Sequence, residues 1–110
     1  IIMEADNIIE AFTQVVKEQD YVFSPDAITD IPKLQQNLSA IENLTSEAIA
    51  EVLRQWYINH ESVRDAILVE EREIKKVEKT KPQSQEKTLE NRYWILEEEL
   101  QKLQQRKQQK

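Results

Sequence analysis

The chain has no glycine in 110 residues, and this absence limits its possible folds more than any other feature. Glycine supplies the positive-φ positions of tight hairpins, β-bulges and phosphate-binding loops. Without it, P-loops and glycine-rich dinucleotide-binding turns are excluded, and an antiparallel sheet is disfavoured. The chain is instead rich in Glu, Gln, Lys, Leu and Ile, with only three prolines. This composition favours helices, so we predict an all-α fold.

Helical periodicity and helix-start residues divide the first half of the chain. Apolar residues in 2–19 repeat at i, i+3, i+4 and i+7, which predicts an amphipathic helix. Ser24 and Pro25 have the residue types of an N-cap and a first helical position. Pro32 disfavours helix in the residue before it, so we predict a short turn and then a new helix over 32–43.

The second half contains two longer periodic segments. Thr45 predicts a helix start, after which helical periodicity continues to residue 79, either as one helix or with a break at residues 59–62. Residues 80–84 predict a loop before a last helix over 85–108. The apolar residues of this helix step by 4, 3, 4 and 3, which is a heptad pattern. We predict that the two segments form a long antiparallel helical hairpin that resembles a coiled coil. Glu70 interrupts its apolar seam, so we expect the hairpin to be buried against the body or a second chain.

Charge is distributed unevenly along the chain. Residues 1–60 carry ten acidic and three basic residues, a net charge of −7, whereas residues 61–110 carry eleven acidic and twelve basic residues, a net charge of +1. We therefore predict a compact acidic helical body over 1–60 and a hairpin arm over 61–110, together forming one structural unit. An acidic body repels phosphate backbones, so we do not expect nucleic acid as the main partner.

Several other classes of protein and site are disfavoured. Cysteine is absent, which excludes disulfides and is compatible with a reducing compartment, so we expect a cytoplasmic location. No segment approaches the roughly 18 consecutive apolar residues of a membrane span, so we expect no membrane association. A single histidine with scattered carboxylates has no metal-ligand spacing, and no serine lies in a glycine-flanked elbow. We expect no metal, no cofactor and no enzymatic activity.

Arg54 and His60 are the only candidates for a catalytic pair. The Arg-x5-His spacing resembles, in outline, the Arg-x(4–6)-His motif of HEPN-domain ribonucleases, which are small all-α proteins. The resemblance covers seven residues. It implies a composite site at a dimer interface, with His60 as the acid–base group and Arg54 holding the cleaved phosphate. An HEPN-like ribonuclease, or an inactive relative of one, is therefore our alternative hypothesis for function.

A structural interpretation competes with this catalytic one. His60 continues the apolar stripe through Leu53 and Trp56, which predicts that it points inward near a helix junction, bonded to a carboxylate or a backbone carbonyl. Six residues of a straight helix turn about 600°, so Arg54 and His60 would lie about 120° apart. Only a break at residues 59–61 would bring the two side chains together.

The last helix carries the candidate interaction residues. Trp94 lies beside the heptad seam, where it either anchors a protein contact or folds back over the acidic body. We predict a non-enzymatic adaptor, assembly or regulatory module that forms a homodimer or captures a protein partner through the hairpin. The predicted interaction residues are Tyr93, Trp94, Leu96, Leu100 and Leu103. A third hypothesis is a nucleic-acid accessory protein that uses basic residues near the hairpin tip, namely Arg72, Lys75, Lys76, Lys79 and Lys81.

Overall fold

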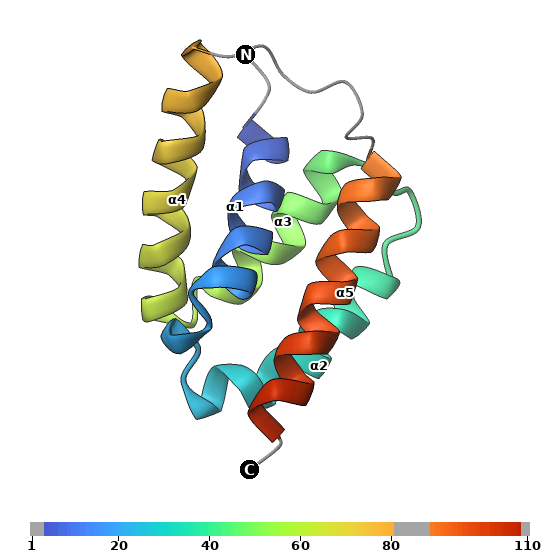
Figure 1. Cartoon of the computed structure of the whole chain (residues 1–110). Coiled ribbons are helices and arrows are strands. Elements are labelled where there is room, and N and C mark those ends of the chain that lie inside the picture. Colours follow the sequence, from blue (N-terminus) through green and yellow to red (C-terminus); the bar gives the residue numbers. More distant parts are fainter. Residues whose placement is uncertain (1–3, 81–88, 109–110) are drawn as a thin grey trace.

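The computed structural model describes residues 4–80 and 89–108, and these residues form helices and connecting turns without any strand (Figure 1). The all-α prediction is therefore confirmed for the described part of the chain. The helices are α1 (Glu4–Glu18), a short 3-10 helix η1 (Asp20–Val22), α2 (Pro25–Ser39), α3 (Ser46–Tyr57), α4 (Glu61–Thr80) and α5 (Leu89–Gln108).

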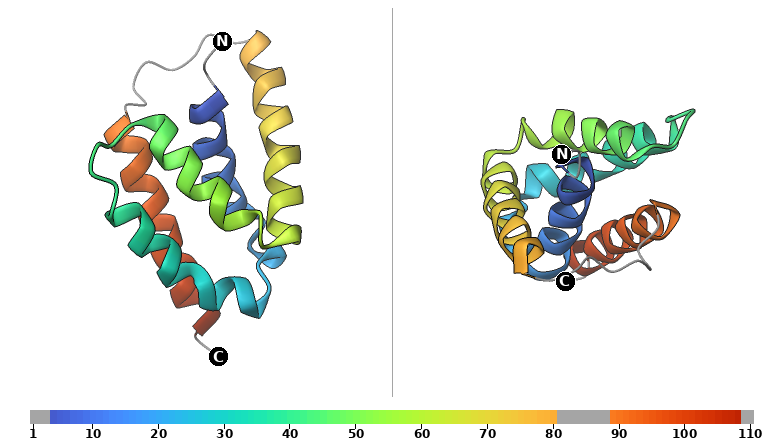
Figure 2. Two further views of the ribbon diagram at one scale, coloured as in Figure 1. Left: turned by 180° about the vertical axis from the view of Figure 1, so that it is seen from behind. Right: turned by 90° about the horizontal axis from the view of Figure 1, so that it is seen from above.

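The first helix, α1, lies at the centre of the fold. It packs against α3, α4 and α5, and α2 closes the structure by packing against α3 and α5. The view from above shows these helices arranged around α1 (Figure 2). The described residues have a radius of gyration of 13.5 Å, and one apolar core draws side chains from all five α-helices. Phe12, Val15 and Val16 of α1 have no exposed surface.

The two helices of the predicted hairpin do not pack directly on each other, so this part of the prediction is wrong. The helices α4 and α5 run in opposite directions, but α1 lies between them, and they make no extended contact with each other (Figure 1). Each buries its apolar row against α1 instead. The row on α4 is thin, because Glu70 interrupts it between Ile67 and Ile74. By contrast α1 buries apolar side chains over a broad face, namely Ile8, Ile9, Ala11, Phe12, Val15 and Val16.

Two helix starts follow the sequence prediction. The Oγ of Ser24 accepts a hydrogen bond from the backbone N–H of Ala27 at 3.2 Å, and Pro25 is the first residue of α2. The Oγ1 of Thr45 accepts a hydrogen bond from the N–H of Ala48 at 3.0 Å, before α3. Each side chain satisfies a backbone donor that has no partner inside its helix.

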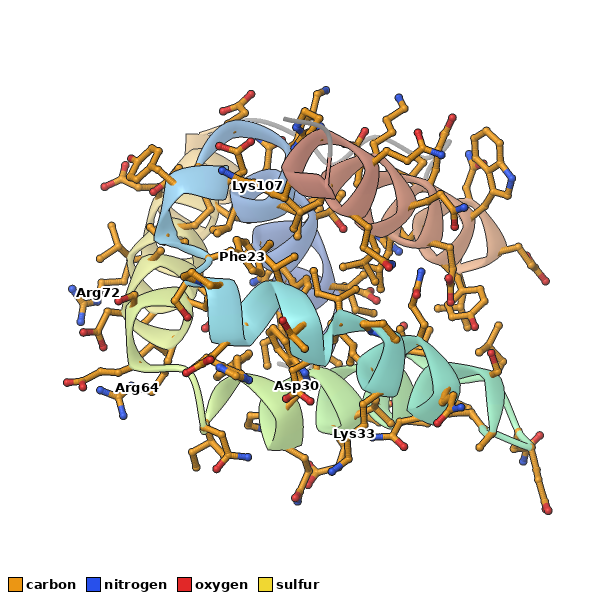
Figure 3. The ribbon with its side chains drawn as sticks, turned by 90° about the horizontal axis from the view of Figure 1, so that it is seen from below. Phe23, Asp30, Lys33, Arg64, Arg72 and Lys107 are labelled. Atoms are coloured by element: carbon orange, nitrogen blue, oxygen red, sulfur yellow. The ribbon has the colours of Figure 1, made fainter. Side chains whose placement is uncertain are left out.

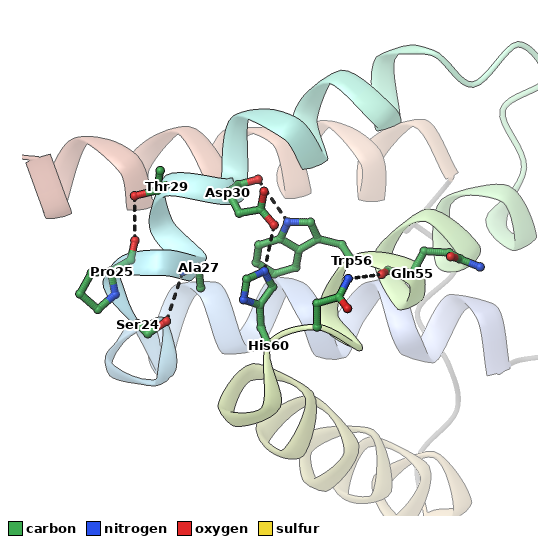
Figure 4. A network of polar contacts seen from close by, with 9 residues as sticks. Ser24, Pro25, Ala27, Thr29, Asp30, Gln55, Trp56 and His60 are labelled. Atoms are coloured by element: carbon green, nitrogen blue, oxygen red, sulfur yellow. Dashed lines mark hydrogen bonds and ion pairs between the residues drawn. The ribbon is translucent and has the colours of Figure 1, made fainter.

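Pro32 does not end a helix, contrary to the prediction. The α2 helix passes through Pro32 and ends at Ser39, before the predicted residue 43. Proline removes one backbone donor and bends a helix, and Figure 4 shows α2 bending near Asp30. Ile31 and Leu34 on either side of Pro32 are fully buried. This burial offsets the lost backbone hydrogen bond, so the helix continues.

The segment over residues 46–79 is broken, as one of the two sequence alternatives predicted. The helix α3 ends at Tyr57 and α4 begins at Glu61. The N–H of His60 donates to the carbonyl of Tyr57 at 2.9 Å, and the carbonyl of His60 accepts from the N–H of Arg64 at 2.9 Å. His60 thus closes one helix and opens the next. Most of the predicted 80–84 loop, and the predicted start of the last helix at residue 85, lie outside the described residues.

Candidate functional site

His60 lies in a polar contact network that joins α2 to the α3–α4 junction. Its Nε2 is 3.0 Å from Oδ2 of Asp30, and its ring centroid is 4.4 Å from that of Trp56 (Figure 4). The indole N–H of Trp56 donates to the backbone carbonyl of Asp30 at 3.2 Å. The His60 side chain is only 13% exposed. His60 therefore has the carboxylate partner that the structural interpretation predicts.

Arg54 pairs with a glutamate of its own helix, not with His60. Its guanidinium Nη2 lies 3.1 Å from Oε1 of Glu51 on the same helix, and both side chains are about half exposed. Hydrogen bonds from Gln55 and Arg54 lower the pKa of Glu51. No hydrogen bond or ion pair joins Arg54 to His60 in the described part of the chain. The two side chains thus do not form, within one chain, the pair that the ribonuclease resemblance implies.

A cleft of about 260 Å³ lies beside His60. Its rim includes the carboxylates of Asp26 and Glu61, and Asp30 lies directly behind the histidine. A phosphate placed in this cleft would face the carboxylates of Asp26 and Glu61, and no Lys or Arg is among the residues that line it. Arg64, next in the chain after the lining residue Val63, pairs with Glu61 and Asp65. This electrostatic setting is unfavourable for RNA.

The predicted interaction residues of α5 divide into two groups. Leu96, Leu100 and Leu103 have no exposed surface, because they pack into the chain's own core. Tyr93 is partly buried, and burial together with a hydrogen bond to Glu97 raises its pKa to about 12. Trp94 is 62% exposed. Of the five, only Trp94 offers a large surface to a partner while the fold stays intact.

Carboxylates surround the exposed tryptophan. Residues three or four positions apart are neighbours on a helix surface, so Glu90, Glu97 and Glu98 lie beside Trp94. Glu98 has one nearby cation, the Nζ of Lys102 at 3.9 Å. We define the Trp94 face as Glu90, Trp94, Glu97 and Glu98. It combines a large exposed aromatic side chain with concentrated negative charge.

A groove is lined by residues of α1, α4 and α5. The helix α1 lies between the other two (Figure 1). The volume of the groove is about 300 Å³. Asn91, three positions before Trp94 on α5, lines the groove, so the groove adjoins the Trp94 face. Sequence reasoning missed this groove because it paired α4 with α5 directly. The lining residues are Ile9, Glu10, Thr13, Gln14, Lys17, Ile74, Asn91, Arg92 and Ile95.

Arg92 fixes one wall of this groove. Its Nη1 lies 3.6 Å from Oδ1 of Asp6, and its side chain is 15% exposed. The Nε atom of Arg92 is buried and has no hydrogen-bond partner. Asp6 in turn accepts a hydrogen bond from the hydroxyl of Ser46, so the contact ties α5 to α1 and α3. Arg92 is therefore directed into the protein, away from the Trp94 face.

A second cleft and an exposed arginine lie on other parts of the surface. A cleft of about 700 Å³ lies between α2 and the end of α5, with Phe23 in its wall and Lys107 at its edge (Figure 3). Arg72 is exposed on α4 and points away from the protein (Figure 3). The remaining predicted basic side chains, those of Lys75, Lys76, Lys79 and Lys81, lie outside the description.

Within residues 4–80 and 89–108, no group of three or more His, Asp or Glu side chains is placed to hold a metal ion. No helix in these ranges combines the length and apolar character needed to cross a bilayer. Comparisons with protein-family models, with curated proteins and with solved structures found no match to this chain. Function is therefore inferred from the Trp94 face, the adjoining groove and the cleft beside His60.

Proposed function

We propose that the protein is a non-enzymatic interaction module that captures a protein partner on the outer face of α5. The observation that carries this proposal is the division of one helix into two faces. Leu100 on the inner face has no exposed surface, whereas Trp94 on the outer face is 62% exposed. Tryptophan is enriched among the residues that dominate binding energy at protein interfaces. An aromatic side chain of this size on a charged helix fits a contact anchor.

Capture of a partner fits the packing of α5 better than dimerisation through its leucines. A leucine-mediated dimer would require α5 to leave α1 and α2, which exposes Leu96, Leu100 and Leu103 before any new contact forms. Burial of one leucine side chain stabilises a fold by about 1.5–3 kcal/mol, so this step would be costly. Contact through Trp94 leaves the core unchanged.

The groove beside Trp94 supports a helical partner. A helix placed along α5 would contact Trp94 and Ile95 at once, and it would cover the side of α1 that lies between α4 and α5. Binding of an amphipathic helix in a groove is a recurring mode of peptide recognition. The partner helix would thus lie between α4 and α5, which do not pack directly on each other.

Affinity capture with matched variants tests this proposal. The bait proteins are the wild type, Trp94→Ala, and Tyr21→Ala as a control that removes an exposed aromatic side chain from η1. We expect a set of proteins that wild type and Tyr21→Ala retain and that Trp94→Ala loses by about tenfold or more. Equal capture by all three baits would show that Trp94 is not the anchor and would contradict the proposal.

A further inference from the structure

The exposed charges within one turn of Trp94 are all negative. Residues 90–98 contain one base, Arg92, and that side chain is turned inward toward Asp6. Glu90 and Glu98 lie one turn before and one turn after the tryptophan, and Glu97 lies on its flank. The nearby cation that the structure gives these carboxylates is Lys102, beside Glu98. A partner that covers Trp94 and carries its own cations would therefore offset the negative charge that remains.

We propose that the occupant of the Trp94 face is a basic amphipathic helix of a protein partner, a proposal that rests on the proposed function. Glu90 and Glu98 are eight residues apart on α5, which corresponds to about 12 Å along the axis. A partner helix with a Lys or Arg, an apolar residue four positions later and a second Lys or Arg four positions after that has the same spacing. Its apolar residue would meet Trp94 between the two charge pairs.

The chemistry of tryptophan favours the same partner. The face of an indole ring attracts a guanidinium or ammonium group placed within about 6 Å of the ring centre. An arginine can therefore stack on Trp94 and bond a neighbouring carboxylate through its planar group. Negative charge and an exposed indole ring on one face thus favour the same kind of ligand, a cationic one.

A second copy of the chain does not fit this face. A symmetric contact through Trp94 would bring Glu90, Glu97 and Glu98 of one copy against the same residues of the other, at a net charge of −6 for each chain. Like charges placed opposite one another across an interface suppress association. The face is therefore suited to a basic partner and unsuited to self-association.

Fluorescence titration tests the proposal with defined probes. Trp56 is 4% exposed, so binding at α5 should change mainly the emission of Trp94. The probes are three synthetic amphipathic helical peptides of about 18 residues with the same leucine face. Their polar positions carry Lys and Arg, Gln, or Glu. We expect the basic peptide to bind about tenfold or more tightly than the acidic one, with the difference shrinking as salt is added.

Charge-reversal variants separate this face from overall charge. Glu90→Lys with Glu98→Lys should weaken binding of the basic peptide by about tenfold and strengthen binding of the acidic one. Glu51→Lys with Asp65→Lys makes the same change in net charge at exposed positions of α3 and α4, and it should leave binding within about twofold. Equal weakening by both pairs, a preference for the acidic peptide, or no binding of any peptide would overturn the proposal.

Failure of this inference is distinguishable from failure of the proposed function. If Trp94→Ala abolishes capture of protein partners but the peptides show no preference for positive charge, a partner binds here and its chemistry is not basic. If Trp94→Ala leaves capture unchanged, the proposed function itself fails. Light scattering of the protein alone covers the remaining case, because a dimer that Trp94→Ala dissociates would place a second copy on this face and overturn the inference.

Discussion

At the scale of the residue, Glu70 shows how a carboxylate is held, partly buried, on the apolar row of α4. It lies on the row of α4 that faces α1, where the side-chain amide of Gln19 donates to its Oε1 at 3.4 Å. Burial raises the pKa of Glu70, and the nearby carboxylates of Glu18 and Glu73 raise it further. The carboxylate thus interrupts the apolar row and stays partly buried there.

Replacement of Glu70 by Gln should stabilise the fold at neutral pH. Because the folded-state pKa is raised, protonated Glu70 favours the native state, and this contribution is lost as pH rises through the folded pKa. We expect Glu70→Gln to increase the free energy of unfolding at pH 7 by an amount that shrinks toward about pH 4, measured by urea denaturation. Glu51→Gln is the opposite control, because the pKa of Glu51 is lowered. A gain from Glu70→Gln that grows as pH falls would contradict this account.

At the scale of the element, capping residues predict where helices begin, because they act on nearby backbone groups. Features that depend on contacts between distant residues could not be predicted in this way. Ser24 and Thr45 cap helices through bonds to residues three positions later, so their roles are visible in short stretches of sequence. Whether α2 continues through Pro32 depends on burial of α2 against other helices and on the bend near Asp30. The carbonyl of Asp30 accepts a hydrogen bond from Trp56, 26 residues away. No local pattern reports such a contact.

His60 stabilises the junction between α3 and α4. We expect His60→Ala to lower the free energy of unfolding by about 1–3 kcal/mol, because it removes the partner of the Asp30 carboxylate and the packing on Trp56. Arg54→Ala, which removes an exposed ion pair, should change stability by less than about 1 kcal/mol. Urea denaturation measures both. A catalytic pair would instead predict loss of RNA cleavage by both variants without any loss of stability for His60→Ala.

At the scale of the whole molecule, the heptad of α5 predicts a buried face correctly, but it does not predict which helix covers that face. Steps of 4, 3, 4 and 3 show that Leu96, Leu100 and Leu103 share one face, and that face is buried. The same steps fit packing against α4, against α1 or against a second chain, so periodicity alone does not choose among them. Trp94 was identified beside the seam, whereas the groove was not, because it exists only when α1 separates α4 from α5.

Equilibrium urea denaturation of Leu100→Ala and Trp94→Ala is the most direct test of the claim that α5 has a structural inner face and a free outer face. We expect Leu100→Ala to lose about 2–5 kcal/mol, because it opens a cavity in the core. Trp94→Ala should stay within about 0.5 kcal/mol of wild type, because it removes an exposed side chain. A loss of several kcal/mol for Trp94→Ala, or none for Leu100→Ala, would show that α5 does not pack as described and would contradict the account.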